Sequence, residues 1–157
     1  MASFRSIMTI FGIVAALILV PAVSASPLTT GTGTGTIGIR SITSGRSADG
    51  NVIQERDLEG TVTGALDGTF TEHVRGVIHS TGLVTFQGTM TFTGTVAGCG
   101  YGTLTLGVSG QGVTGAPISE SSVRVIDDAS NTIDVNGQGT VSQSGPSLTY
   151  EIRYFCK

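Results

Sequence analysis

Apolar and small polar residues alternate along most of this chain, and the pattern is clearest between residues 83 and 106 (LVTFQGTMTFTGTVAGCGYGTLTL). There the even-numbered positions carry large apolar side chains or glycine, whereas the odd-numbered positions are mostly threonine. A two-residue period is typical of antiparallel strands with one face in a core and the other in water. The pattern therefore predicts an all-β domain.

The alternation predicts eight strands, separated by segments rich in Gly, Pro, Asn and Asp, which favour turns. They span residues 36–43, 52–64, 69–80, 83–96, 101–110, 121–127, 132–142 and 147–156. Asn136-Gly137 fits either a bend inside the seventh strand or a hairpin that adds a ninth. As an open sheet these strands would expose two long edges, so we expect an eight-stranded antiparallel meander β-barrel, with a β-sandwich as the alternative.

The N-terminus predicts export. Arg5 precedes an apolar run from Ile7 to Val20, and a small-residue cleavage site ends at Ala25, so residues 1–25 are expected to form a signal peptide. The alternative is an uncleaved membrane anchor, which needs about 20 apolar residues. Residues 26–35 are rich in Gly and Thr and are expected to form a flexible tether before a barrel domain at 36–157. The expected location is secreted, extracellular or periplasmic.

Charge and cysteine content narrow the partners. The chain has 8 Lys and Arg against 11 Asp and Glu, and its basic residues do not cluster along the sequence, which disfavours nucleic-acid binding. We expect no membrane partner once the signal is removed. The 2 cysteines, Cys99 and Cys156, favour a disulfide in an exported chain.

The meander brings the two cysteines together, because the turn after its fourth strand and the end of its eighth strand lie at the same end of the barrel. We expect the end that carries the Cys99–Cys156 disulfide, called the stapled end below, to be shut. The mouth of the barrel is expected at the end where the 80–82 turn and the 115–117 turn are not found together.

No motif specifies a reaction or a cofactor. Residues 110–115 (GQGVTG) match the dinucleotide fingerprint, but Pro117 and a strand follow instead of the required helix. His73 and His79 are about 20 Å apart along one strand, too far to share a metal ion. The acidic segment 127–136 lacks the ligand spacing and terminal glutamate of a calcium loop. We therefore expect no metal and no cofactor.

Arg56 and Glu72 form the most informative polar pair, because both fall on the predicted inner face and a hairpin around residues 65–67 would bring them close together. A buried charge is costly unless it is paired. The pair therefore predicts an internal ion pair, a bulge that turns one side chain outward, or the polar floor of a ligand cavity. In the last case Glu72 is the candidate proton acceptor, and Tyr150 and Tyr154, on the same face, are hydrogen-bonding walls.

The order of residues from about Leu58 to Phe155 resembles a bacterial family of small barrel proteins of unknown function, grouped with the allene oxide cyclase and dirigent barrels. The matching pieces are LEGT at 58–61, FTGTV at 92–96, GTL at 102–104, GQGTV at 137–141 and LTYEIRY at 148–154. The chain departs from that family before the seventh strand, where DDASN at 127–131 replaces a glycine-rich turn. The resemblance implies an eight-stranded antiparallel barrel and no particular activity.

An eight-stranded barrel encloses either packed side chains or one small molecule. The sequence therefore favours a secreted binding module for a small apolar ligand, with Arg56, Glu72, Tyr150 and Tyr154 as candidate ligand-binding residues. A cyclase-like or isomerase-like enzyme that uses Glu72 is one alternative, and the sequence does not favour it. A solid-cored extracellular structural or interaction protein is the other, and the large inner side chains fit either a filled or a hollow barrel.

Overall fold

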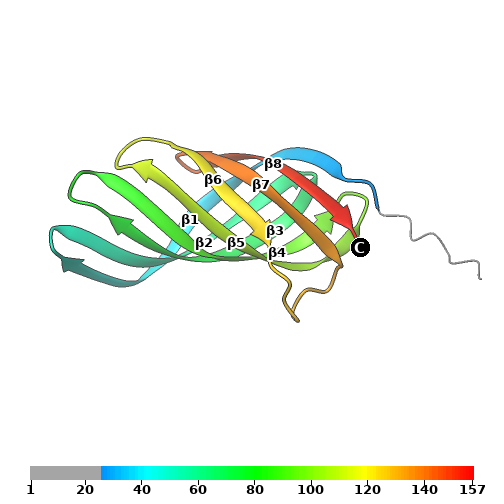
Figure 1. Ribbon diagram of the computed structural model, residues 1–157, viewed down its shortest axis with the longest axis horizontal. Helices are drawn as coiled ribbons and strands as arrows, with labels where there is room; N and C mark the ends of the chain where they lie inside the picture. Colours follow the sequence, from blue (N-terminus) through cyan, green and yellow to red (C-terminus); the bar gives the residue numbers. More distant parts are fainter. Residues whose placement is uncertain (1–25) are drawn as a thin grey trace, which may run out of the picture.

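The protein is a closed barrel of eight antiparallel strands in meander order (Figure 1). The computed structural model describes residues 26–157, apart from the side chains of residues 119 and 120. The strands are β1 (Thr29–Ala48), β2 (Asn51–Gly64), β3 (Leu66–Ile78), β4 (Leu83–Val96), β5 (Gly100–Val113), β6 (Ile118–Val125), β7 (Val135–Ser144) and β8 (Ser147–Cys156). Within residues 26–157 no helix is long and apolar enough to cross a membrane.

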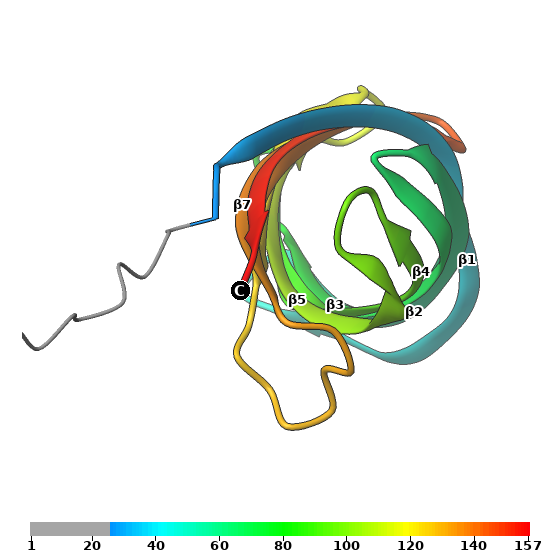
Figure 2. The ribbon, with the colours of Figure 1, turned by 90° about the vertical axis from the view of Figure 1, so that its right-hand side faces the viewer.

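The predicted fold class is confirmed, because each strand pairs with the next and β8 pairs back onto β1, so the strands form a ring (Figure 2). Closure leaves both long edges paired, which explains why the barrel is adopted in place of the alternative sandwich. Asn136-Gly137 lies inside β7, opposite Phe155 and Tyr154 of β8, and adds no ninth strand. The predicted signal peptide, residues 1–25, lies outside the described residues.

The strand that closes the ring begins earlier than the sequence predicts. Residues 29–36, most of them expected to form a tether, are the first part of β1 and pair with β8 from Thr29↔Tyr154 to Thr36↔Ser147. The tether prediction is wrong, because burial of large side chains is not what orders this segment. Here the backbone hydrogen bonds to β8 order the segment, and its glycines allow close packing: a Cβ at Gly33 would overlap the Tyr150 hydroxyl and the Thr63 carbonyl.

The core is built from the inward-facing positions of the strands, and it is densest towards one end of the barrel. Large buried side chains there include Phe70, Phe92, Val96, Leu104 and Tyr154. Interior glycines make room for the rings, since a Cβ at Gly60 would overlap Phe70. This end is therefore closed by packed side chains.

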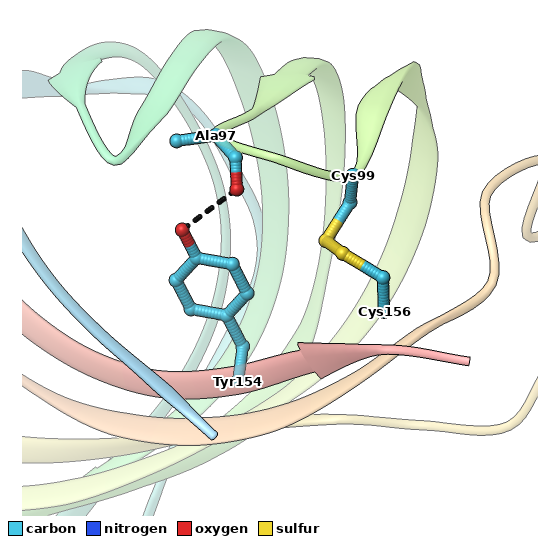
Figure 3. Close-up of a disulfide and its surroundings, with 4 residues drawn as sticks. All are labelled: Ala97, Cys99, Tyr154 and Cys156. Atoms are coloured by element: carbon cyan, nitrogen blue, oxygen red, sulfur yellow. Dashed lines mark hydrogen bonds between the residues drawn. A yellow bond between two sulfur atoms is a disulfide. The ribbon is translucent and has the colours of Figure 1, made fainter. Parts of the chain in front are cut away.

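The same end carries a disulfide between Cys99 and Cys156, whose Cα atoms are 5.4 Å apart (Figure 3). Cys99 lies in the turn after β4 and Cys156 ends β8, as the meander predicts. Next to the disulfide, the Tyr154 hydroxyl donates a hydrogen bond to the Ala97 carbonyl oxygen at 2.8 Å. The last strand is thus tied to the β4–β5 turn by a covalent bond and a partly buried hydrogen bond.

The connection between β6 and β7, residues 126–134, is a long loop that projects beside the ring at this end (Figure 2). The seventh strand was predicted to start at residue 132 but starts at Val135. Thr132 and Asn131 instead bond to the β5 backbone: Thr132 Oγ1 accepts from Thr103 N, and Asn131 Oδ1 accepts from Thr105 N, each at 2.7 Å. The loop therefore takes the hydrogen-bonding place beside β5 that a longer β6 or β7 would occupy.

Candidate functional site

The barrel is hollow at the end opposite the disulfide. A cavity of about 400 Å³ lies between the inner faces of the strands and reaches Thr114, Gly115 and Ala116 in the β5–β6 turn. Most of its walls are aliphatic or aromatic, contributed by Ile37, Leu58, Val62, Phe70, Val74, Phe86, Met90, Leu106, Val108, Val123 and Leu148 among others. The barrel is therefore not packed throughout its length.

The mouth of this cavity is at the end where β1, β3, β5 and β7 end. Ile39 and Val113, which line the cavity, are 57% and 58% exposed there. The stapled end is packed, but the predicted position of the mouth is wrong. In a meander the turns after the third and fifth strands lie at one end, opposite the turn after the fourth, so the mouth is at the end that holds both.

Glu72 projects into this cavity from the middle of β3. It is only 6% exposed, and its cross-strand neighbours are Leu58 in β2 and Met90 in β4. Within the described part of the chain, no group donates a hydrogen bond to its carboxyl and no cation forms an ion pair with it. Burial raises the pKa of Glu72 to about 7. Near neutral pH the group is thus divided between an acid and a carboxylate.

Arg56 also lines the cavity, but the predicted ion pair with Glu72 is absent from the described residues. Arg56 is paired with Val74 and Glu72 with Leu58, so the two are diagonal neighbours on one face. The guanidinium turns along its own strand, where Nε and Nη2 donate to Gln54 Oε1, the Nε bond at 3.1 Å. That position lets Arg56 remain only half-buried and avoids most of the cost of burying its charge.

Of the two tyrosines predicted as walls, Tyr150 lines the cavity and Tyr154 does not. The Tyr150 hydroxyl accepts from Leu66 N at 2.8 Å and lies 3.0 and 3.1 Å from the carbonyl oxygens of Leu66 and Thr63. Burial also raises the pKa of Tyr150 above its usual value. Tyr154 lies beyond it, beside the disulfide. Both hydroxyls are therefore bound to the protein backbone, and Tyr150 offers the cavity its ring.

Sequence reasoning missed four further polar residues that line the cavity, Gln54, Thr114, Ser121 and Gln143. Thr114 donates to the Gly82 carbonyl oxygen, Ser121 to that of Val141, and Gln143 to that of Gly145. Strand parity would have found Gln54, which precedes Arg56 by two residues. Across the described residues, Glu72 is thus the polar side chain of the cavity wall that lacks a protein partner. A hydrogen bond to this group is therefore the polar contact that would add most to the binding free energy of a molecule in the cavity.

Among the described residues there is no group of three or more His, Cys, Asp or Glu side chains that could hold a metal ion. What the cavity combines is a largely apolar surface and one carboxyl group that has no protein partner among the described residues. Such a site can enclose an apolar molecule, exchange one hydrogen bond with it, and accept or supply a proton.

The fold and the cavity define a class of protein: a small closed meander barrel with one apolar compartment open at one end. The chain is similar to a crystal structure of a protein of unknown function from the DUF3224 family of Shewanella oneidensis MR-1. The TM-score is 0.65 at 16% identity, over 83% of this chain and 98% of that chain. No family model matches the chain, and neither does any curated protein. The similarity therefore extends to the fold, and the resemblance to allene oxide cyclases stays a prediction.

Proposed function

We infer that the protein binds one small, largely apolar molecule inside the barrel, as a secreted binding protein. The observation that carries this inference is the unpartnered carboxyl of Glu72 inside an apolar cavity of about 400 Å³. Cavities of about 300–1,000 Å³ with apolar walls and few polar groups are typical of small-molecule sites. Because no protein group in the described residues bonds to this carboxyl, a ligand that reaches it through the cavity would supply its hydrogen-bond partner.

The ligand has an apolar body and one polar group that meets Glu72. A protonated Glu72 donates a hydrogen bond to a carbonyl or hydroxyl oxygen, and an ionised Glu72 accepts one from a hydroxyl or amine. Arg56 and Gln54 lie nearer the mouth, where a second polar group of the ligand would remain in contact with water.

Export is supported by the predicted signal peptide, and the Cys99–Cys156 disulfide is compatible with an extracellular or periplasmic location. N-terminal sequencing of the protein from its own host should begin at Ser26. An intact Met1 in the membrane fraction would contradict export as a cleaved protein.

Gly76 offers a way to block the cavity without disturbing its walls. It lines the cavity, and a Cβ built there meets no atom closer than 3.9 Å. Gly76→Phe should therefore fill the cavity. Gly38→Phe is the matched control, because Gly38 does not line the cavity and a Cβ there has nothing within 4 Å.

The experiment is a fluorescence titration with N-phenyl-1-naphthylamine, a neutral apolar dye, with native mass spectrometry of protein from its own host to identify the natural ligand. Saturable binding that Gly76→Phe abolishes and Gly38→Phe retains is the expected result. Equal binding by both variants, or no binding by the parent, would contradict the proposal.

A cyclase-like or isomerase-like enzyme is the second candidate, and one observation favours it. A pKa near 7 suits a general acid or base, since such a group is present in both protonation states at neutral pH. The natural ligand, once identified, allows the test. If it is turned over, Glu72→Gln should abolish turnover while retaining binding; an unchanged ligand after long incubation would exclude this candidate.

A further inference from the structure

A second hollow lies on the outside of the barrel, across the outer faces of β3 to β8. Its volume is about 980 Å³, and β6 and β7, which cross its middle, lie at the front in Figure 1. Three arginines, Arg75, Arg124 and Arg153, line this outer groove together with one carboxylate, Glu151. The groove is thus cationic on a chain whose net charge is −3.

These three guanidinium groups have no partner in the described part of the chain, since none of them forms an ion pair or a side-chain hydrogen bond there. Other cationic side chains form ion pairs: Arg40 pairs with Glu59 at 3.9 Å, and Lys157 pairs with Asp134 at 3.4 Å. The groove therefore carries unneutralised positive charge.

The acidic side chains at the edge of the groove are mostly engaged elsewhere. Asp57 accepts from His73 Nδ1 at 2.7 Å, and the bonds from His73 and Ser41 lower the pKa of Asp57. Glu55, opposite Arg75 in the β2–β3 ladder, accepts from Ser44 at 3.0 Å. These hydrogen bonds do not remove the charges of Asp57 and Glu55, but both carboxylates lie at the edge of the groove. Its lining itself carries three guanidinium groups against one carboxylate, Glu151.

The strand register arranges the arginines in two adjacent rows. Arg124, Gln138 and Arg153 are consecutive partners across β6, β7 and β8. Because strands lie about 4.8 Å apart, the two arginine backbones are about 10 Å apart with the Gln138 amide between them. Arg75 stands in the neighbouring row, which continues through Gln87 to Ser109, Ser122 and Thr140.

Gly107 explains why the surface is hollow. It is the outward-facing partner of both Thr89 in β4 and Arg124 in β6, so the middle of the floor has no side chain. A Cβ built at Gly107 would meet Ile126 at 3.4 Å, which is ordinary van der Waals contact. The position therefore accommodates a Cβ, and a larger side chain built from it would project into the groove.

We propose that the outer groove binds a linear acidic polysaccharide. Guanidinium groups pair with carboxylates or sulfates in fork geometry, and the amides and hydroxyls of the floor both donate and accept, as sugar hydroxyls require. The sugar chain lies across the strands, with its anionic groups at Arg124 and Arg153 and its hydroxyls on Gln138 and the adjoining row.

Other polyanions fit the groove less well. It has no Phe, Tyr or Trp side chain on which nucleobases would stack, and the imidazole of His73 in its lining is hydrogen-bonded to Asp57. It has no free strand edge to which a peptide would add, because every strand is paired on both sides. It is concave, and the large exposed apolar residues of the described chain (Leu28, Ile39, Ile42, Leu83, Tyr101 and Val113) all lie outside it, which disfavours a membrane surface.

The test is calorimetric titration of the full-length mature protein with an alginate oligosaccharide, a linear chain of carboxylated sugars, at low and at physiological ionic strength. Arg124→Ala and Arg153→Ala should each weaken binding by about tenfold, the loss of one charge-assisted contact. Arg46→Ala, which removes the same charge from an exposed position outside the groove, should leave affinity unchanged. Gly107→Tyr should abolish binding with the charge intact.

Three results would overturn the proposal: no binding of alginate by the parent protein, an Arg46→Ala loss equal to that of Arg124→Ala, or equal affinity for poly-glutamate, which would make the partner an acidic peptide. Unchanged thermal midpoints confirm that the variants fold. Unchanged binding of the neutral dye separates this groove from the internal cavity, so each site can fail without the other.

Discussion

Gly33 of β1 lies directly opposite Tyr150 of β8 across the seam that closes the barrel, and the tyrosine hydroxyl occupies the space that a Cβ at Gly33 would need. That hydroxyl in turn bonds to the backbone of Thr63 and Leu66 at the β2–β3 turn. One close contact thus joins the first strand, the last strand and a turn between the second and third.

Gly33→Ala should therefore destabilise the barrel by about 1 to 3 kcal/mol, the usual cost of overpacking a well-packed site. Gly38→Ala is the matched control, because it adds the same methyl group to the same strand where nothing lies within 4 Å. Urea unfolding of both variants measures the difference. Equal stabilities would mean that the first part of β1 does not pack as described.

The disulfide should stabilise the fold by about 4 kcal/mol in the chain-entropy model, since it joins residues 57 apart in the sequence. The double variant Cys99→Ser/Cys156→Ser should lose about that amount in denaturant unfolding. Intact mass after alkylation without reductant should reveal no free thiol in the parent protein. Two alkylated thiols in freshly prepared protein would contradict the bond.

Tyr154→Phe should cost about 0.5 to 1.5 kcal/mol, because it removes the partly buried hydrogen bond to the Ala97 carbonyl oxygen, which water can then reach. Tyr101→Phe removes the same hydroxyl from a side chain that is 71% exposed, and should leave stability unchanged. Thermal unfolding of the two variants separates the hydrogen bond from the general effect of losing a hydroxyl. A parental midpoint for Tyr154→Phe would contradict its role at the stapled end.

The buried Glu72 should make stability fall as pH rises. Below its ordinary value of 4.5 the carboxyl is protonated in both states; between 4.5 and about 7 the unfolded chain ionises while the folded barrel holds the proton. The stability contributed by the neutral acid is therefore complete below 4.5 and lost by the time pH passes about 7. The shift corresponds to about 3 kcal/mol.

Glu72→Gln is the control for this prediction, because it has the shape of the neutral acid and does not titrate. Urea unfolding of both proteins at about pH 4 and about pH 8 should show the parent losing about 3 kcal/mol relative to the variant. A difference that stays constant with pH would mean that the carboxyl is solvated. The variant breaks no ion pair with Arg56, since the structure contains none among its described residues.

Much of the fold follows from local pattern. The alternation through Phe86, Met90 and Phe92 predicts which side of β4 faces inward, because the side-chain period of a strand is two wherever it pairs. Turn residues set the number of strands. Because each strand of a meander reverses direction, the turn after the fourth strand and the end of the eighth lie at one end of the barrel, which brings Cys99 and Cys156 together. Most of residues 29–36 were not predicted as a strand, because a run of Gly and Thr shows no apolar alternation. Backbone pairing and contact with Tyr150 hold β1 in place there.

Within the candidate site, the sequence by itself determined that Arg56, Glu72 and Tyr150 face the interior, because parity fixes the side of a strand on which a residue lies. Only the tertiary structure decided what each of them meets. The Arg56 guanidinium donates to Gln54, and the Tyr150 hydroxyl is bound by the backbone. The Glu72 carboxyl faces the cavity without a partner among the described residues. Likewise, Arg75, Arg124 and Arg153 are far apart in the sequence, and ring closure with its register sets them around one groove. Parity is a local property of the backbone, whereas contacts between distant strands depend on register and on the space that neighbouring side chains leave.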